Sequence, residues 1–217
     1  MDDTTRLIAI RHGETDWNVN GRIQGQLDIE LNPRGLWQAL RAGQALEHEP
    51  IAAVYASDLR RAWQTALEIA RHTGAPVYPE TRLRERAFGC FEGRIFTEIE
   101  AEHPEAARLW RQRDPHFAPP GGESLFDFRA RITAVAQDLA ARHAGQQIVL
   151  VAHGGVMDVL YRSATQQELQ TPRTWALGNA AINRLLWTPQ GLALVGWGDD
   201  RHLEGDAAAL DEPKIGN

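Results

Sequence analysis

Short apolar runs alternate with longer amphipathic segments along most of the chain, and this alternation limits the fold more than any other feature. Residues 51–56 and 147–152 are mostly apolar, as in strands buried on both faces, whereas residues 34–47 and 59–72 show helical apolar spacing. Parallel strands joined by helices form a three-layer α/β/α sandwich, in which helices cover both faces of a mostly parallel sheet. We therefore predict this α/β fold class.

Further elements are predicted around this frame. No repeat or linker composition interrupts the pattern, so residues 1–217 are predicted to form one domain, with a mobile tail from about residue 205. Apolar periodicity and turn residues predict the other elements: strands at residues 7–10 and 76–78, a helical region at residues 96–113 interrupted at Pro104, a helix at residues 124–143, a helix from about Gly155, and a hairpin of residues 182–187 and 192–197.

The charge of the chain limits its partners. The net charge is −6, so the chain as a whole has no electrostatic reason to bind nucleic acid, and an anionic ligand would need a local positive pocket. Of the 23 basic residues, only Lys214 is a lysine. This composition excludes P-loop phosphoryl transfer and Schiff-base or pyridoxal chemistry, which need a buried lysine. Arginine instead holds a phosphate through two parallel hydrogen bonds.

Nothing in the sequence indicates a membrane or an oxidising compartment. The apolar runs are too short to span a bilayer, and the acidic start, Met1-Asp2-Asp3, argues against a signal peptide. The single cysteine, Cys90, cannot form an internal disulfide. We therefore expect a cytoplasmic protein without nucleic-acid or membrane partners. The sequence leaves the oligomeric state open.

Two histidines follow predicted buried strands, and each is followed by glycine. His12 comes after residues 7–10, and His153 comes after residues 147–152. Ligands of open α/β sheets bind at the carboxyl ends of the strands, where a glycine lets a ligand approach the backbone. Either histidine alone is as well explained by capping or core packing. Their joint occurrence favours a shared site.

A series of motifs in fixed order accompanies these histidines and covers roughly residues 7 to 203. Together the motifs resemble the histidine phosphatase superfamily, also called phosphoglycerate-mutase-like. They are Arg11-His12-Gly13-Glu14-Thr15 with Trp17-Asn18, Gly21-Arg22-Ile23-Gln24-Gly25, Leu31-Asn32-Pro33-Arg34-Gly35, Ser57-Asp58-Leu59-Arg60-Arg61-Ala62, Leu83-Arg84-Glu85, Phe88-Gly89, Glu92-Gly93, Pro120-Gly121-Gly122-Glu123-Ser124 and Val151-Ala152-His153-Gly154-Gly155.

The resemblance implies a phosphomonoesterase that acts on a small phosphorylated metabolite through a phosphohistidine. His12 takes the role of the nucleophile, since a neutral imidazole attacks phosphorus well near pH 7. The family's mechanism uses no cofactor, and the other histidines show no metal-binding spacing. Arg11, Arg61 and His153 are implied as catalytic donors to the phosphoryl oxygens. The implied phosphate- and substrate-binding residues are Arg11, Asn18, Gln24, Gly25, Arg61, His153 and Gly154.

Glu85 matches the family's acid/base position. One carboxyl group can protonate the leaving alkoxide and later deprotonate the attacking water. The other interpretation of Glu85 is an ordinary surface ion pair, because arginines flank it on both sides. Glu14 and Glu123 are interpreted as residues that order the site from outside.

Several departures from the mutase pattern favour a phosphatase. The mutase branch has a His-Tyr pair where this chain has Ala87 and Phe88, and it has a longer basic insertion where residues 93–120 contain no lysine. A cofactor-dependent phosphoglycerate mutase remains the alternative, because Arg111 and Arg113 could bind a substrate carboxylate. A non-catalytic phosphate-binding regulatory module is the second alternative.

Overall fold

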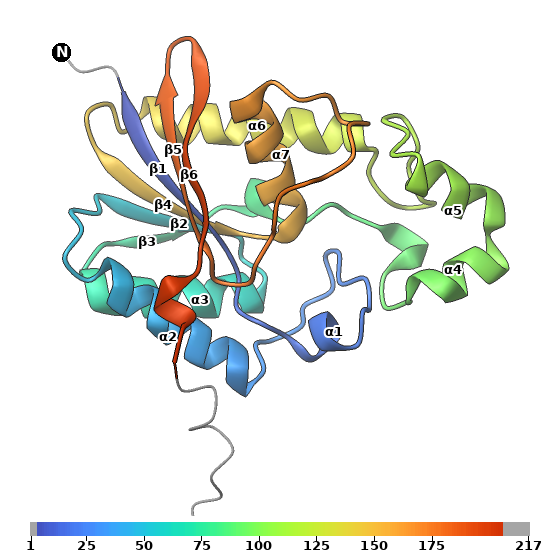
Figure 1. Cartoon of the computed structure of the whole chain (residues 1–217), viewed down its shortest axis with the longest axis horizontal. Helices are drawn as coiled ribbons and strands as arrows, with labels where there is room; N and C mark the ends of the chain where they lie inside the picture. The colour runs from blue at the N-terminus through green and yellow to red at the C-terminus, as the bar shows by residue number, and fades with distance from the viewer. Residues whose placement is uncertain (1–3, 206–217) are drawn as a thin grey trace, which may run out of the picture.

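Six strands form one sheet in the computed structural model, which describes residues 4–205 (Figure 1). Strands β1 to β4 run parallel, and β5 is antiparallel to both of its neighbours, β1 and β6. In spatial order the strands are β3 (Val77–Pro79), β2 (Ala53–Ala56), β4 (Gln147–Ala152), β1 (Thr5–Arg11), β5 (Ile182–Thr188) and β6 (Gly191–Asp199).

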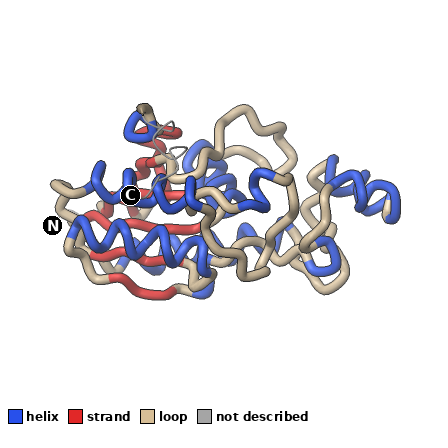
Figure 2. The backbone as a smooth tube through the Cα atoms, turned by 90° about the horizontal axis from the view of Figure 1, so that it is seen from below, coloured by secondary structure: helices blue, strands red, loops and turns tan. Residues whose placement is uncertain are grey.

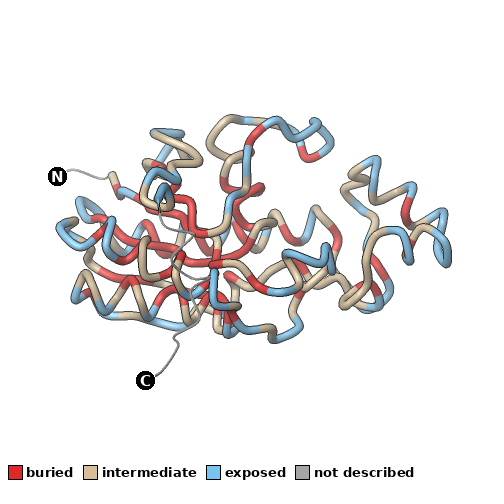
Figure 3. The backbone as a smooth tube through the Cα atoms, turned by 60° about the horizontal axis from the view of Figure 1, so that its bottom comes forward, coloured by how far each residue is buried: buried red, intermediate tan, exposed pale blue. Residues whose placement is uncertain are grey.

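Helices cover both faces of this sheet and complete three layers. Successive residues of β1 point to opposite faces, so Leu7 and Ile8 belong to two different cores. Figure 3 shows that burial is concentrated in the central strands. The predicted fold class is confirmed. The helices are α6 (Leu125–Ala141) and α7 (Gly154–Thr165) on the Leu7 side, and α2 (Pro33–Leu46) and α3 (Arg60–Thr73) on the Ile8 side.

Local sequence signals set the ends of the helices that border the site. The side chain of Asn32 accepts a hydrogen bond from the Gly35 amide at 2.8 Å, and Pro33 occupies the first turn of α2. Helix α3 ends just before Gly74, whose φ of 69° is the left-handed conformation that glycine adopts readily. Both ends agree with the sequence-based prediction to within one or two residues.

Two short helices lie apart from the three layers (Figures 1 and 2). They are α4 (Phe96–Glu102) and α5 (Pro104–Arg111), and the predicted break at Pro104 separates them. Ile99 of α4 and Ala107 of α5 form a small core of their own with Phe91. This segment lies beyond the carboxyl edge of the sheet, where it can border a site at that edge.

Single-turn elements were not predicted, because one turn is too short to show periodicity. These elements are α1 (Asp16–Val19) and the 3-10 turns Thr81–Leu83, Gly89–Phe91 and Arg201–Leu203.

The predicted tail lies outside the described residues from 206 onward, and the one-domain organisation stays a prediction. Within residues 4–205, no helix is long and apolar enough to cross a membrane.

Candidate active site

The sheet register brings the two strand-end histidines together. Strands β1 and β4 are parallel neighbours, and Arg11 is paired with Ala152 at their carboxyl ends. The His12 amide continues this ladder by donating to the Ala152 carbonyl at 2.9 Å. His153 directly follows β4, and the centroids of the two imidazole rings lie 5.2 Å apart. The neighbouring strands therefore place both histidines at one edge of the sheet.

The ring of His12 is held in one tautomer. Its Nδ1 lies 2.7 Å from the carbonyl oxygen of Gly13, which can only accept, so Nδ1 carries the proton and Nε2 keeps a free lone pair. Burial lowers the pKa of His12 well below its usual value, and the charges of Arg61 and Arg11 lower it further. The imidazole is thus neutral near pH 7, as a nucleophile must be.

His153 is fully buried beside His12. Its Nε2 lies 2.8 Å from the hydroxyl of Ser57, whereas its Nδ1 has no hydrogen-bond partner among the described residues. Burial, and then the charge of Arg61, lower the pKa of His153 well below its usual value. If Nε2 accepts the Ser57 hydroxyl proton, Nδ1 carries an N–H that is available to a ligand oxygen.

Two arginines give the site its positive charge. Arg61 is fully buried and donates to the carbonyls of Leu27 at 2.8 Å and Gly25 at 2.7 Å. Arg11 donates to the carbonyl of Leu177 at 2.5 Å. The Nε atoms of both arginines are buried and have no partner among residues 4–205. Burial lowers the pKa of Arg61 to about 10, so it remains charged at neutral pH.

These side chains border a small cavity of about 160 Å³. Most of the residues that the sequence assigned to the site line it, and three further residues, Arg22, Ile23 and Phe88, complete the wall. His153 does not line this cavity; it is fully buried, with its ring centroid 5.2 Å from that of His12. The assigned residues in the lining are Arg11, His12, Asn18, Gln24, Gly25, Arg61, Glu85 and Gly154.

Glu85 is fixed at the edge of this cavity by two backbone amides. Its Oε2 accepts from Gly155 at 2.9 Å, and its Oε1 accepts from Arg86 at 2.8 Å. The flanking arginine side chains bind elsewhere, since Arg84 pairs with Asp58 and Arg86 donates to backbone carbonyls. The surface ion-pair interpretation is therefore wrong, and Glu85 faces the cavity instead.

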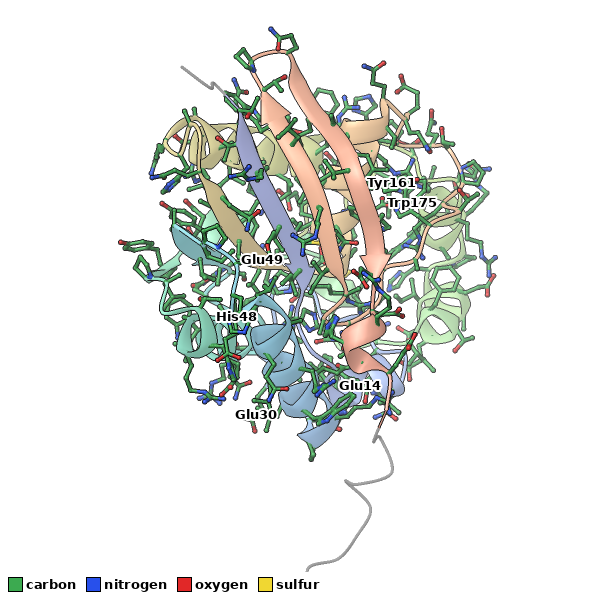
Figure 4. The ribbon with its side chains drawn as sticks, turned by 60° about the vertical axis from the view of Figure 1, so that its left-hand side comes forward. Glu14, Glu30, His48, Glu49, Tyr161 and Trp175 are labelled. Carbon is green, nitrogen blue, oxygen red and sulfur yellow. The ribbon has the colours of Figure 1, made fainter. Side chains whose placement is uncertain are left out.

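The other two glutamates of the motifs do not line the cavity. Glu14 accepts from the side chain of Asn32 at 3.0 Å at the start of α2, and Figure 4 shows it beside that helix. Glu123 forms an ion pair with Arg131 at 2.7 Å. Both therefore support the loops around the site, as the sequence-based interpretation had it.

Two asparagines, Asn18 and Asn179, place amide groups near His12. The Oδ1 of Asn18 accepts from the Thr15 amide at 3.0 Å, which leaves the Nδ2 of Asn18 as a donor at the cavity wall. The Nδ2 of Asn179 donates to the carbonyl oxygen of His12 at 2.8 Å. Sequence reasoning missed Asn179, because it lies in the irregular segment between α7 and β5, where no periodicity or quoted motif marks it.

Metal ligands do not cluster in the part of the chain that the structure describes. Among residues 4–205, no group of three or more histidine, cysteine, aspartate or glutamate side chains is placed to hold a metal ion. The positive groups at the site are instead arginines. That the chemistry needs no metal ion stays a prediction.

The sequence also matches a known family. The profile described as "Histidine phosphatase superfamily (branch 1)" matches residues 7–200. The chain belongs to this superfamily. The resemblance inferred from the ordered motifs is therefore confirmed, and the match covers most of the described residues.

The relatives of this histidine phosphatase are named either as mutase-like proteins or as phosphatases. It is 38% identical to the phosphoglycerate mutase-like protein 4 of Arabidopsis thaliana, over 93% of this chain and 88% of the relative. It is 36% identical to a metal-independent phosphoserine phosphatase of the same plant, over 93% and 84%. A solved mycobacterial glucosyl-3-phosphoglycerate phosphatase in complex with VO3 superposes with a TM-score of 0.79 at 35% identity, over 89% of this chain and 99% of that one.

Proposed function

We propose that the chain hydrolyses phosphomonoesters and that His12 carries the phosphoryl group between the ester and water. The observation that carries this proposal is the state of the His12 ring: Nδ1 is bound to the Gly13 carbonyl, and a lowered pKa keeps Nε2 unprotonated. Attack by Nε2 on phosphorus forms an N–P bond while the ester P–O bond breaks, which divides one difficult displacement into two easier ones.

The phosphoryl group needs several fixed donors, because its negative charge is spread over three oxygens. Arg11 and Arg61 supply charged N–H groups whose Nε atoms lack other partners, and Asn18 supplies an amide at the wall. His153 is assigned as a further donor, because its ring lies 5.2 Å from that of His12 and its Nδ1 has no other partner among the described residues. Because backbone contacts already hold the arginine side chains in place, little reorganisation accompanies binding.

Glu85 is assigned the proton transfers. In the first step it donates a proton to the leaving alkoxide, and in the second it accepts a proton from the water that attacks the phosphohistidine. The second step breaks the N–P bond, releases inorganic phosphate and returns the proton to Glu85. The amides of Gly155 and Arg86 hold the carboxyl group in position for both steps.

A phosphatase is favoured over a mutase by the surroundings of this site. Phe88 lines the cavity at one of the positions where the mutase pattern has a His-Tyr pair. Arg111 pairs with Glu100 at 2.5 Å and does not line the cavity, and Arg113 is bound to Asp158. The two arginines that the sequence offered for a substrate carboxylate are therefore both paired with carboxylates of the protein. The names of two of the relatives, which are phosphatases of phosphoserine and of glucosyl-3-phosphoglycerate, support the same choice.

A panel of small phosphate esters, assayed for inorganic phosphate with and without EDTA, tests the proposal. We expect phosphate release from esters including p-nitrophenyl phosphate, unchanged by the chelator, and little 3-phosphoglycerate isomerisation in parallel. Loss of activity in EDTA that Mg²⁺ restores would contradict the arginine-based account. Isomerisation faster than hydrolysis would make the chain a mutase, and no turnover at all would favour a binding module.

A further inference from the structure

A second cavity, of about 190 Å³, lies beside the first one. The two cavities share Glu85, Phe88 and Gly154 in their walls, so the acid/base carboxyl group lies on the border between them. In the proposed reaction the phosphoryl group lies at His12 and the leaving oxygen lies at Glu85. The second cavity is therefore where the organic part of the ester would extend.

Aromatic and aliphatic side chains form one wall of this second cavity. The rings of Phe88 and Trp110 stack with centroids 5.0 Å apart and an interplanar angle of 9°. Such a wall suits the carbon skeleton of a small ligand, while a few polar groups determine which ligand is bound. The aliphatic and aromatic side chains on the other sides are Leu125, Phe128, Val159, Leu169 and Leu177.

Three arginines line the second cavity, and two of them are already bound. Arg86 donates to the carbonyls of Glu123 and Phe117. Arg113 donates to the carbonyl of Leu169 and forms an ion pair with Asp158, which also lines the cavity. Arg173 is exposed and makes no hydrogen bond or ion pair with any residue from 4 to 205. It is thus the free cation of the lining.

The segment that carries Arg173 is held on both sides. Arg162 donates to the carbonyl of Thr171 at 2.8 Å, and its guanidinium lies 4.8 Å from the centroid of the Trp175 ring. The Trp175 ring stacks on Tyr161 of α7 with the ring centroids 4.1 Å apart. The two residues are labelled next to each other in Figure 4. Arg173 lies between these two anchored residues, so its backbone is fixed at the cavity although its side chain is exposed.

The charges of the lining favour an anion. Asp158 opposes the three arginines, and Glu85 opposes them only when it is ionised, so the lining has a formal positive excess in either state of Glu85. Arg113 and Arg162 bind one oxygen of Asp158, and its other oxygen, Oδ1, is buried without a partner among the described residues. One guanidinium matches a carboxylate through two parallel hydrogen bonds, whereas the nearby Asp158 would repel a phosphate dianion more strongly.

We propose that the second cavity binds the organic part of the ester and that Arg173 recognises a carboxylate on it. This proposal rests on the proposed function, because it assigns the leaving group of the same reaction. The selected substrates are phosphate esters that carry a carboxylate, such as phosphorylated hydroxy or amino acids. Arg173 is then the residue that determines specificity.

The test compares two esters that differ only in the charged group, 3-phosphoglycerate and glycerol 3-phosphate. Arg173→Ala should lower kcat/KM for 3-phosphoglycerate by about 10- to 100-fold, mainly through KM, as expected for loss of a charge-assisted hydrogen bond. For glycerol 3-phosphate the change should stay within about twofold. Arg111→Ala is the matched control, because this exposed arginine lines neither cavity.

The outcomes separate this proposal from the proposed function. If the wild-type chain hydrolyses p-nitrophenyl phosphate but shows no preference for the carboxylated ester, the role of Arg173 is overturned and the phosphatase stands. The role of Arg173 is also overturned if Arg173→Ala leaves the wild-type preference unchanged, or if it lowers kcat/KM equally for both esters. If the wild-type chain hydrolyses no ester, the proposed function itself fails, and this proposal fails with it. Arg173→Lys should restore part of the preference, because it keeps the charge without the paired donors.

Discussion

At the scale of single residues, the contacts of Glu85 decide its role. Its immediate sequence neighbours are arginines, but both carboxylate oxygens accept from backbone amides, and the arginine side chains bind other groups. A carboxyl group held by backbone at a cavity edge is suited to proton transfer, whereas a surface ion pair would only add a small and screened stabilisation.

Glu85→Gln should reduce turnover in a way that depends on the leaving group. General acid–base help is typically worth about 10²–10⁴-fold, and a sugar alkoxide needs the proton whereas p-nitrophenolate does not. The phosphorylation step should therefore slow by most of that factor for the sugar ester and only slightly for the nitrophenyl ester. Rapid-quench measurement of the first turnover with both esters checks this expectation. An equal loss for both esters would remove Glu85 as the proton donor.

The sequence identified most of the cavity lining, because the functional residues lie in motifs at strand ends and helix starts. It missed Asn179 and Arg173, which lie in the segment between α7 and β5. No periodicity operates there, and the contacts of both residues depend on how that segment folds back over β1 and α7. Arg111 and Arg113 had the right chemistry in the sequence but are bound to other groups in the structure.

At the scale of elements, the start of α7 connects the sheet to the acid/base group. Gly155 lies in the first turn of this helix, and its amide donates to Glu85. A Cβ added at Gly155 would lie 2.2 Å from Glu85 Oε1 and 3.0 Å from a ring carbon of Phe128. A glycine is therefore required here by the close approach of a side chain, and not by the backbone conformation.

Gly155→Ala should impair catalysis more than folding. The Glu85 carboxyl group must move to make room for the methyl group, so we expect kcat to fall by about 10-fold or more, within the range of acid–base effects. Stability should fall by about 1–3 kcal/mol, as for other cases of overpacking. Steady-state kinetics and urea denaturation measure the two effects. Gly196→Ala is the control, because its added Cβ would meet no atom within 4 Å; equal kinetics in both variants would contradict the role of this contact.

The long elements were predictable because their apolar spacing is repeated over several turns or a whole strand. The predicted strand at residues 147–152 agrees with β4 at both ends, and the break at Pro104 separates α4 from α5. The strand order was not predictable in detail, since β4 inserts between β1 and β2 although it follows them by many residues. Pairing of this kind depends on long-range packing and leaves little local signal.

At the scale of the whole molecule, the stability should depend on pH through its buried histidines. Burial lowers the pKa of His12 and His153 well below the unfolded value of about 6.5, and it also lowers the pKa of His202. Below pH 6.5 the unfolded chain binds protons that the folded chain does not, so the free energy of unfolding should fall as the pH falls. The limit is about 1.4 kcal/mol per pH unit for each histidine.

Urea denaturation between pH 7.5 and pH 5.5 measures this dependence. Arginines lower the pKa of carboxylates such as Glu49 and Glu80. These groups titrate below this pH window, so they do not contribute to the slope measured within it. His153→Asn should reduce the slope because it removes one of the titrating groups. A stability that stays constant over the window would show that the histidines are not held buried and neutral.

The central claim is that His12 becomes phosphorylated, and trapping the phosphoenzyme tests it most directly. Glu85→Gln enzyme mixed with p-nitrophenyl phosphate should release a burst of p-nitrophenol and then accumulate phosphohistidine, because the water step still needs the missing base. After an alkaline quench, peptide mapping by mass spectrometry should find one phosphoryl group on residue 12, which is stable to base and lost in acid, and none in His12→Ala. A burst without label on His12, or label on His153 instead, would contradict the account.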